Sequence, residues 1–150
     1  MKSRHPEMHQ RYMLIFKIDA ANLIHRIHAR RQDYIEAFSL KRDRNIFTEV
    51  FRSRYAEASA YDLSHCSQEV ITTLDQFYSS VDELHWYLKH TQDMPTTIED
   101  EVMRKVSRLK RLHQTLDLHL EAELTGVDIE ALSQNIVLEE VEEEPGTLDF

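Results

Sequence analysis

Apolar residues between positions 61 and 91 recur at alternating steps of four and three. From Val70 onward the steps are 4, 3, 4, 3 and 4, which keeps the side chains on one face of a helix. A heptad repeat of this length predicts one long amphipathic helix over 61–91 with a buried seam. The residues of that seam are Leu63, Val70, Leu74, Phe77, Val81, Leu84 and Leu88, with Ser67 in the remaining slot.

The same alternation predicts a second long helix that begins just after Pro95. Thr96 and Glu99 have the spacing of a capping box, and acidic residues follow in the first turn, where the helix dipole favours them. Gly126 suits the left-handed position that ends many helices. The seam of this helix contains Val102, Val106, Leu109, His113, Leu116 and Leu120.

The N-terminal region also contains a helical repeat, with a wider apolar face. Met13, Phe16, Ala20, Leu23 and Ile27 follow the steps 3, 4, 3 and 4. A face this wide predicts a central helix, or one that is shared with a second chain. The residues that widen it are Leu14, Ile15, Ile18 and Ile24.

A polar stretch over 39–45 predicts a turn, and a second helix is predicted after it. That helix would carry Ile46, Phe47, Val50, Phe51, Tyr55 and Ala58. Whether the first helix continues through Tyr34, Ile35 and Phe38 is open.

The end of the chain differs from the helical part in composition. Asp128 can cap a short helix over about 129–136. Beyond it, residues 137–150 are acidic, are interrupted by Pro145 and Gly146, and have few apolar groups to offset the entropy of ordering. We therefore predict a flexible, disordered acidic tail over 137–150.

These elements define the expected fold. Only 2 glycines and 3 prolines in 150 residues argue against strands joined by tight turns. We predict an all-α protein, an up-and-down four-helix-type bundle with long antiparallel helices and a short C-terminal helix. Residues 1–136 would form a single domain followed by the tail.

Charge is distributed unevenly along the chain. Residues 1–54 carry 12 Lys and Arg against 6 Asp and Glu, whereas residues 55–150 carry 6 against 21. Such asymmetry predicts self-association, a folded-back tail, or two partners of opposite charge. The single cysteine, Cys66, excludes an internal disulfide, and the apolar patch over 12–18 is too short to cross a bilayer. We expect a cytoplasmic protein.

Nine histidines raise the possibility of a metal site inside the bundle. His113 lies on the predicted seam, with Asp117 four residues later, and His119 and His85 could point inward as well. A metal- or ligand-binding bundle is therefore one alternative function. The Glu-x-x-His motif of di-iron bundles is absent, so we predict no metal site and no cofactor.

No catalytic motif is present in the sequence. His65 and Cys66 are adjacent, but neighbours on a helix point about 100° apart and do not face each other. Cys66 is predicted to be a small buried hydrophobic residue. Two glycines cannot build a phosphate-binding loop, and we expect a protein that is not an enzyme.

A basic stripe is predicted on the outer face of the second long helix, because Val106 and Leu109 face the core. Stripes of this kind bind phosphates or anionic head groups, so an anionic polymer or membrane surface is a second alternative partner. The net charge of −9 makes nucleic acid an unlikely ligand. The stripe consists of Arg104, Lys105, Arg108, Lys110 and Arg111.

The acidic tail combines steering charges with an apolar tip. Leu148 and Phe150 alternate across an extended backbone, and an apolar pocket beside an Arg or Lys could bind the Phe ring and the terminal carboxylate together. The stretch "EEVEEEPGTLDF" resembles the C-terminal tip of bacterial single-stranded DNA-binding proteins, with Asp149 in place of a Pro. The final "LDF" also resembles the Leu-x-Phe of sliding-clamp-binding peptides. Both resemblances imply a docking tail.

The sequence thus favours a non-enzymatic adaptor or regulator that binds other proteins. The docking residues would be Leu148, Asp149 and Phe150, with Glu142, Glu143 and Glu144 for steering. The apolar face near 12–27 would support a homodimer or a partner helix. The tail could instead fold back onto a basic face of its own chain.

Overall fold

The computed structural model describes residues 4–126 and 132 of the chain. Every regular element within these residues is helical, which confirms the all-α prediction for this part of the protein. The long helices are α1 (Arg4–Ala29), α4 (Gln68–His90) and α5 (Pro95–Thr125). The short elements are α2 (Arg31–Ser39), α3 (Ala60–Leu63) and the 3-10 helices η1 (Arg44–Glu49) and η2 (Tyr55–Glu57).

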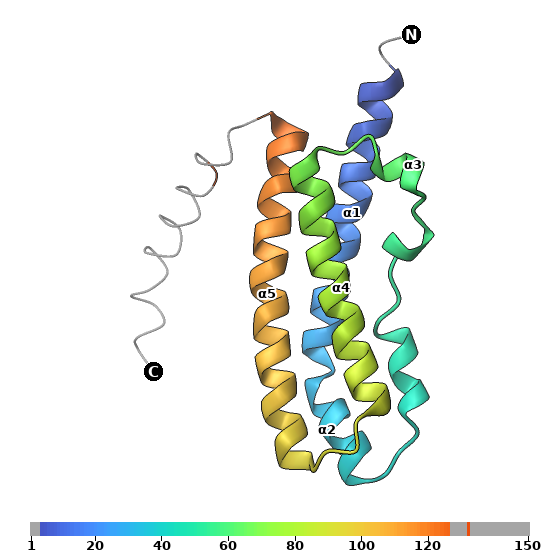
Figure 1. The fold of residues 1–150 in the computed structure, drawn as a ribbon, viewed down its shortest axis with the longest axis vertical. Coiled ribbons are helices and arrows are strands. Elements are labelled where there is room, and N and C mark those ends of the chain that lie inside the picture. The colour runs from blue at the N-terminus through green and yellow to red at the C-terminus, as the bar shows by residue number, and fades with distance from the viewer. Residues whose placement is uncertain (1–3, 127–131, 133–150) are drawn as a thin grey trace.

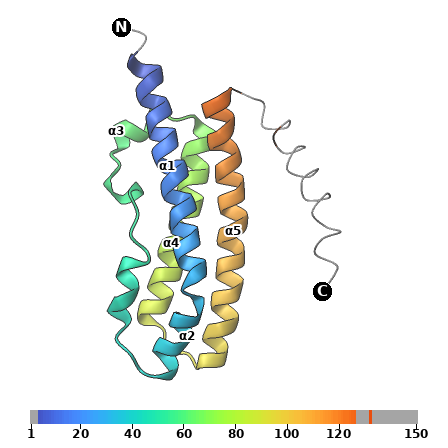
Figure 2. The same ribbon diagram turned by 180° about the vertical axis from the view of Figure 1, so that it is seen from behind.

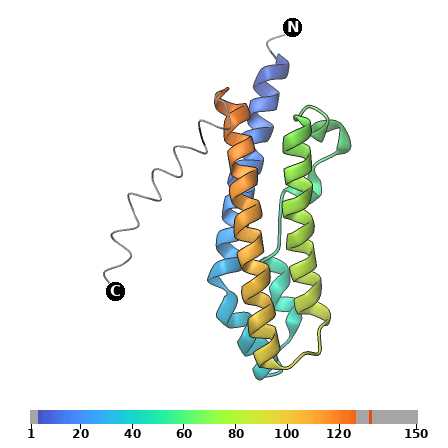
Figure 3. The same cartoon turned by 60° about the vertical axis from the view of Figure 1, so that its left-hand side comes forward.

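The long helices lie side by side along the long axis of the molecule (Figures 1–3). α2 follows α1 in nearly the same direction. The segment between α2 and α4 runs back along the side of α4 that is opposite α5 (Figure 1). The most extensive contacts between elements are those of α5 with α4 and with α1, and α5 also contacts α2. α5 is therefore the helix on which the others assemble.

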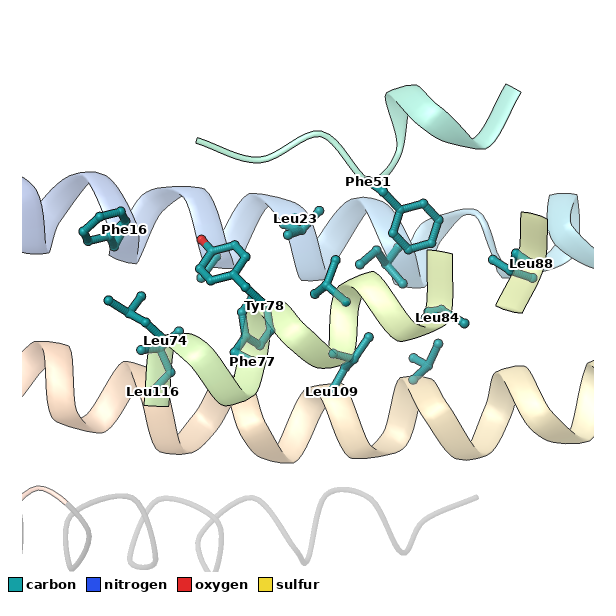
Figure 4. Packing of buried hydrophobic residues seen from close by; sticks show 14 of the residues in the cluster. Phe16, Leu23, Phe51, Leu74, Phe77, Tyr78, Leu84, Leu88, Leu109 and Leu116 are labelled. Atoms are coloured by element: carbon teal, nitrogen blue, oxygen red, sulfur yellow. The ribbon is translucent and has the colours of Figure 1, made fainter. Parts of the chain in front are cut away.

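The core lies between α1, α4 and α5, where the apolar faces meet (Figure 4). The α4 residues of the repeat, from Val70 to Leu88, are each at most 2% exposed. His113 is the exception on α5, since it is only half-buried. The other predicted core residues are buried as well, namely Met13, Phe16, Ala20, Leu23, Ile27, Val102, Val106, Leu109, Leu116 and Leu120.

The helix predicted over 61–91 is interrupted. α3 ends at Leu63, and α4 begins at Gln68 with Ser67 as its N-cap. The Ser67 hydroxyl accepts a hydrogen bond from the Val70 N–H at 3.2 Å, which satisfies one of the free donors at the helix start. A serine in an apolar repeat thus marks a helix end, and the prediction of one continuous helix was wrong.

The helix predicted over 46–58 is also absent, because η1, a turn and η2 take its place. Phe47 and Phe51 are buried against the ring of Tyr34, with centroids 5.2 and 6.3 Å away. Apolar residues here reach the core from an irregular backbone. Its polar groups are satisfied from α1, since Arg26 donates to the carbonyl oxygens of Val50 and Arg52.

Of the two predictions made for the ends of α5, the one for its start was wrong and the one for its end is confirmed. The capping box at Thr96 does not form, because Pro95 occupies the first helical position and Met94 is the N-cap. Proline suits that position since its missing N–H would have no helical partner. Gly126 ends the helix in the left-handed conformation, with φ at +72°, as predicted.

The short helix expected at 129–136 and the tail at 137–150 lie outside the described residues, apart from Leu132. Their predicted structure stays a prediction. Among the described helices, none is both long enough and apolar enough to cross a membrane.

Core packing on α5 makes the first testable prediction. Leu109 is 1% exposed and faces the other long helices (Figure 4). Leu109→Ala should lower the free energy of unfolding by about 3 kcal/mol, through lost burial and the cavity left behind. Met103→Ala on the same helix, where the side chain is 56% exposed, should change it by less than about 0.5 kcal/mol. Equal effects in urea unfolding would contradict the assignment of these faces.

Candidate functional site

A basic groove lies between α4 and α5, and the predicted stripe lines most of it. Arg104, Lys105, Arg108 and Arg111 face a hollow of about 270 Å³. They share a surface because Arg108 lies three or four residues from each of the other three along α5. Ser80 and Glu83 of α4 complete the lining, and Lys110 is not part of it. We call this feature the α4–α5 groove.

The groove carries uncompensated positive charge. Arg104 and Lys105 lie 2.5 and 4.0 Å from the Glu101 carboxylate, and Lys105 also lies over the Tyr87 ring. Arg108 and Arg111 have no side-chain hydrogen bond or ion pair to any of the described residues. Their end of the groove is therefore where an anionic group would be attracted most strongly.

The basic cluster on α1 and α2 is used within the fold. Arg26 holds the backbone at 50–52. Arg30 pairs with Asp33 at 3.2 Å, and Arg31 donates to the carbonyl oxygen of His28.

The cluster that follows α2 is partly used in the same way. Arg42 lies 4.0 Å from the carboxylate of Glu36. Arg44 donates to the backbone carbonyls of Lys89 and Thr91 and stacks over the Phe38 ring. These guanidinium groups connect elements of the fold, unlike those of Arg108 and Arg111.

Part of the charge asymmetry is satisfied inside the chain. The Lys17 ammonium on α1 lies 2.7 Å from Asp117 and 3.1 Å from Glu121 on α5. His9 contacts Glu123 at 3.0 Å, and the same carboxylate accepts from the Ser67 N–H at 3.1 Å. Basic α1 and the acidic end of α5 therefore attract each other.

The outer face of α1 exposes apolar side chains next to one another. Leu14, Ile15 and Ile18 are 49%, 40% and 52% exposed. They lie within one helical turn of each other, and on the opposite side α1 buries Phe16 and Leu23. These three residues, the α1 apolar row, are the part of the predicted 12–27 face that the core leaves uncovered.

The structure does not gather the candidate histidines into one site. His85 stacks on the ring of Phe51 with centroids 4.6 Å apart, whereas His113 lies 5.8 Å from the Phe77 ring centroid. Asp117 pairs with Lys17, and His119 is half-buried on α5. Within residues 4–126 and 132, no group of three or more His, Cys, Asp or Glu side chains is placed to hold a metal ion.

Cys66 is buried, as predicted, and burial raises the pKa of its thiol to about 11. At neutral pH the thiol therefore stays protonated, and a protonated thiol is a poor nucleophile.

A buried carboxylate that sequence reasoning missed is that of Asp19 on α1. Asp19 is 8% exposed and accepts hydrogen bonds from the Tyr78 hydroxyl at 2.6 Å and from the Arg54 N–H at 3.0 Å. Burial and this bond raise the pKa of Tyr78. The sequence does offer a sign of this buried acid, because Asp19 lies between the core positions Phe16 and Leu23.

The predicted tail residues lie outside the described part of the chain. They are Glu142, Glu143, Glu144, Leu148, Asp149 and Phe150. Comparisons of the chain with protein-family models, with curated proteins and with solved structures found no match.

His113 makes a prediction about pH. Burial lowers its pKa, the nearby Asp117 charge opposes that shift, and Lys17 adds to it. The folded chain therefore binds this proton less readily than the unfolded chain, in which a histidine titrates near pH 6.5. Stability should be full above about pH 6.5 and should fall as the pH drops from there towards the lower folded pKa.

His113→Leu should flatten this dependence and raise stability near pH 5, because the variant also removes a buried Nε2 that has no partner among the described residues. Thermal unfolding between pH 5 and 8 measures the effect. His90→Leu, at an exposed position on α4, is the control and should keep the wild-type slope. A wild-type slope in His113→Leu would exclude His113 as the cause.

Proposed function

We propose that this chain is a non-enzymatic helical-bundle adaptor that binds other proteins. The observation that carries the proposal is the α1 apolar row, because Leu14, Ile15 and Ile18 stay exposed beside a core that is already filled. Contiguous exposed apolar side chains are more typical of protein-binding surfaces than of free surface. The antiparallel bundle would serve as a rigid support for this row and for the acidic tail.

The roles of the buried polar groups support a structural rather than a catalytic interpretation. The Asp19 carboxylate accepts hydrogen bonds from the Tyr78 hydroxyl and from the Arg54 N–H. The Tyr34 hydroxyl donates to the Ile27 carbonyl oxygen at 2.9 Å, across the break between α1 and α2. Each of these groups joins segments of the chain. Asp19 also lines a hollow of about 600 Å³ beside Arg26 and Glu49, but both of its oxygens are already hydrogen-bonded within the fold.

The composition of the tail adds a second contact to the proposal. Leu148 and Phe150 would fill an apolar pocket on a partner, and Asp149 between them would face solvent or a basic rim, since side chains alternate along an extended backbone. Glu142 to Glu144 would raise the association rate with a basic partner.

The tail contact is tested by the double variant Leu148→Ala/Phe150→Ala in the full chain. One partner captured by the wild type from a lysate of the source cells should be lost, with affinity reduced at least tenfold, which is about 1.4 kcal/mol. Titration of that purified partner by calorimetry then gives the dissociation constants. Thr147→Ala is the matched control and should bind as the wild type does.

Unchanged circular dichroism of the double variant would show that the fold is intact. Capture of every partner by the double variant would remove the tail from the proposed function.

The α1 apolar row is proposed to contact the same row of a second copy, which gives a homodimer with two-fold symmetry. A stable interface buries about 800 Å² per partner. Three side chains provide only its apolar centre, so we expect a weak dimer. The observation that favours a second copy is that the row is apolar throughout, because a two-fold axis at α1 would bring the same apolar side chains of the two copies together.

Leu14→Glu/Ile18→Glu should therefore weaken the dimer by at least about tenfold, since like charges would face each other at its centre. Sedimentation equilibrium over a range of protein concentrations measures this. Met103→Glu, which adds a charge at an exposed apolar position on α5, is the control. A wild-type protein that stays monomeric at all concentrations would refute the homodimer.

A further inference from the structure

We propose that the acidic run 139–144 of the tail binds in the α4–α5 groove of its own chain. The run contains Glu139, Glu140 and Glu142–Glu144, and the groove presents Arg104, Lys105, Arg108 and Arg111 along one side. The occupant is thus a named segment of this protein, and charge complementarity identifies where it binds.

The positive end of the groove sets the position of the run. Glu101 already compensates Arg104 and Lys105, and Glu83 repels acids at the α4 wall. Arg108 and Arg111 are left without acidic partners among residues 4–126 and 132. Guanidinium groups bind carboxylates with two parallel hydrogen bonds, so these two arginines are the expected anchors for successive glutamates.

Basic side chains that are already bonded within the fold compete less well for the run. Arg26 and Arg44 donate to backbone carbonyls that hold the segment between α2 and α4 in place. Arg30 has an acidic neighbour at 3.2 Å. A glutamate that bound these side chains would have to break bonds of the fold, whereas binding at Arg108 and Arg111 breaks none that the structure describes.

The chain is long enough for the contact. Arg108 lies about 27 Å from Gly126 along α5, at roughly 1.5 Å per residue. Residues 127–138 separate Gly126 from the first glutamate of the run. A connection of that length spans up to about 40 Å when extended, and about 28 Å when 129–136 form the predicted short helix. The left-handed Gly126, at φ +72°, ends α5 and lets the chain change direction there.

A contact made of exposed ion pairs is weak and is screened by salt. It would hold residues 145–150 near the body of the protein and would release them when a more basic partner competes for the run. This regulatory role rests on the proposed docking function of Leu148, Asp149 and Phe150. The groove contact itself does not depend on any partner.

A spin label in the acidic run tests the contact in the full chain. Val141→Cys, in a Cys66→Ala background, places a nitroxide between the glutamates without changing their charge. The amide resonances of Glu83, Arg108 and Arg111 should broaden in a low-salt buffer. They should recover at about 1 M salt, where the screening length falls to about 3 Å.

Arg108→Gln/Arg111→Gln should abolish the broadening, and so should Glu142→Gln/Glu143→Gln/Glu144→Gln, which leaves the folded body unaltered. Lys41→Gln/Arg42→Gln removes the same number of positive charges from another basic cluster and should preserve it. Retained broadening in either the groove variant or the tail variant, or its loss in the Lys41/Arg42 control, would overturn the proposal.

A mixture of two samples tests for other occupants of the groove. One sample carries the spin label without isotope labelling, and the other is isotope-labelled without a spin label. Broadening in this mixture, where no isotope-labelled chain carries a spin label of its own, would assign the groove to the tail of a second copy. A groove that shifts on addition of polyphosphate but never broadens from the tail label would be a site for external anions. Either result overturns the proposal, and neither bears on the Leu148→Ala/Phe150→Ala binding test.

Discussion

The buried carboxylate of Asp19 is the interaction on which the arrangement of the fold depends. One oxygen accepts from the Tyr78 hydroxyl of α4 and the other from the Arg54 N–H, so α1, α4 and the segment between η1 and η2 meet at one side chain. Tyr55 then stacks on Tyr78 with ring centroids 4.3 Å apart. Burying this carboxylate without the two donors would be costly. In a regular helix the Arg54 N–H would bond within the helix instead, so the bond to Asp19 favours the irregular backbone of this segment.

The helix α5 holds the other long helices together, because its different faces contact different neighbours. Its apolar seam packs on α1 and α4, and its acidic end pairs with Lys17 and His9 of α1. Arg108 and Arg111 are left over on the face towards the α4–α5 groove. No acidic residue lies between Glu101 and Asp117 in the sequence, so net positive charge persists at the middle of an otherwise acidic half of the chain.

Buried polar groups that join segments of the fold, together with surfaces that the fold leaves uncovered, are the physical basis of the proposed adaptor function. The polar groups of Asp19, Tyr34 and Tyr78 stabilise the body by joining its segments. The α1 apolar row and the α4–α5 groove contribute little to that body, and each has a chemistry that favours contact, one with apolar side chains and one with carboxylates. Function in this protein would then lie in what covers these two surfaces.

The sequence by itself determined the buried faces of the long helices, because apolar residues at alternating steps of four and three lie on one side of a helix, as Val70 to Leu88 show. It also determined the end of α5 at Gly126, where a left-handed residue is needed. Tertiary structure decided the rest. The apolar residues at 46–58 fit a helix, but the Asp19 and Arg26 side chains of α1 hydrogen-bond with the backbone at 50–54 instead. Which basic side chains form ion pairs and which line the groove depends on the helices that lie beside α5. Such choices rest on contacts between residues far apart in the chain, and local periodicity carries no information about them.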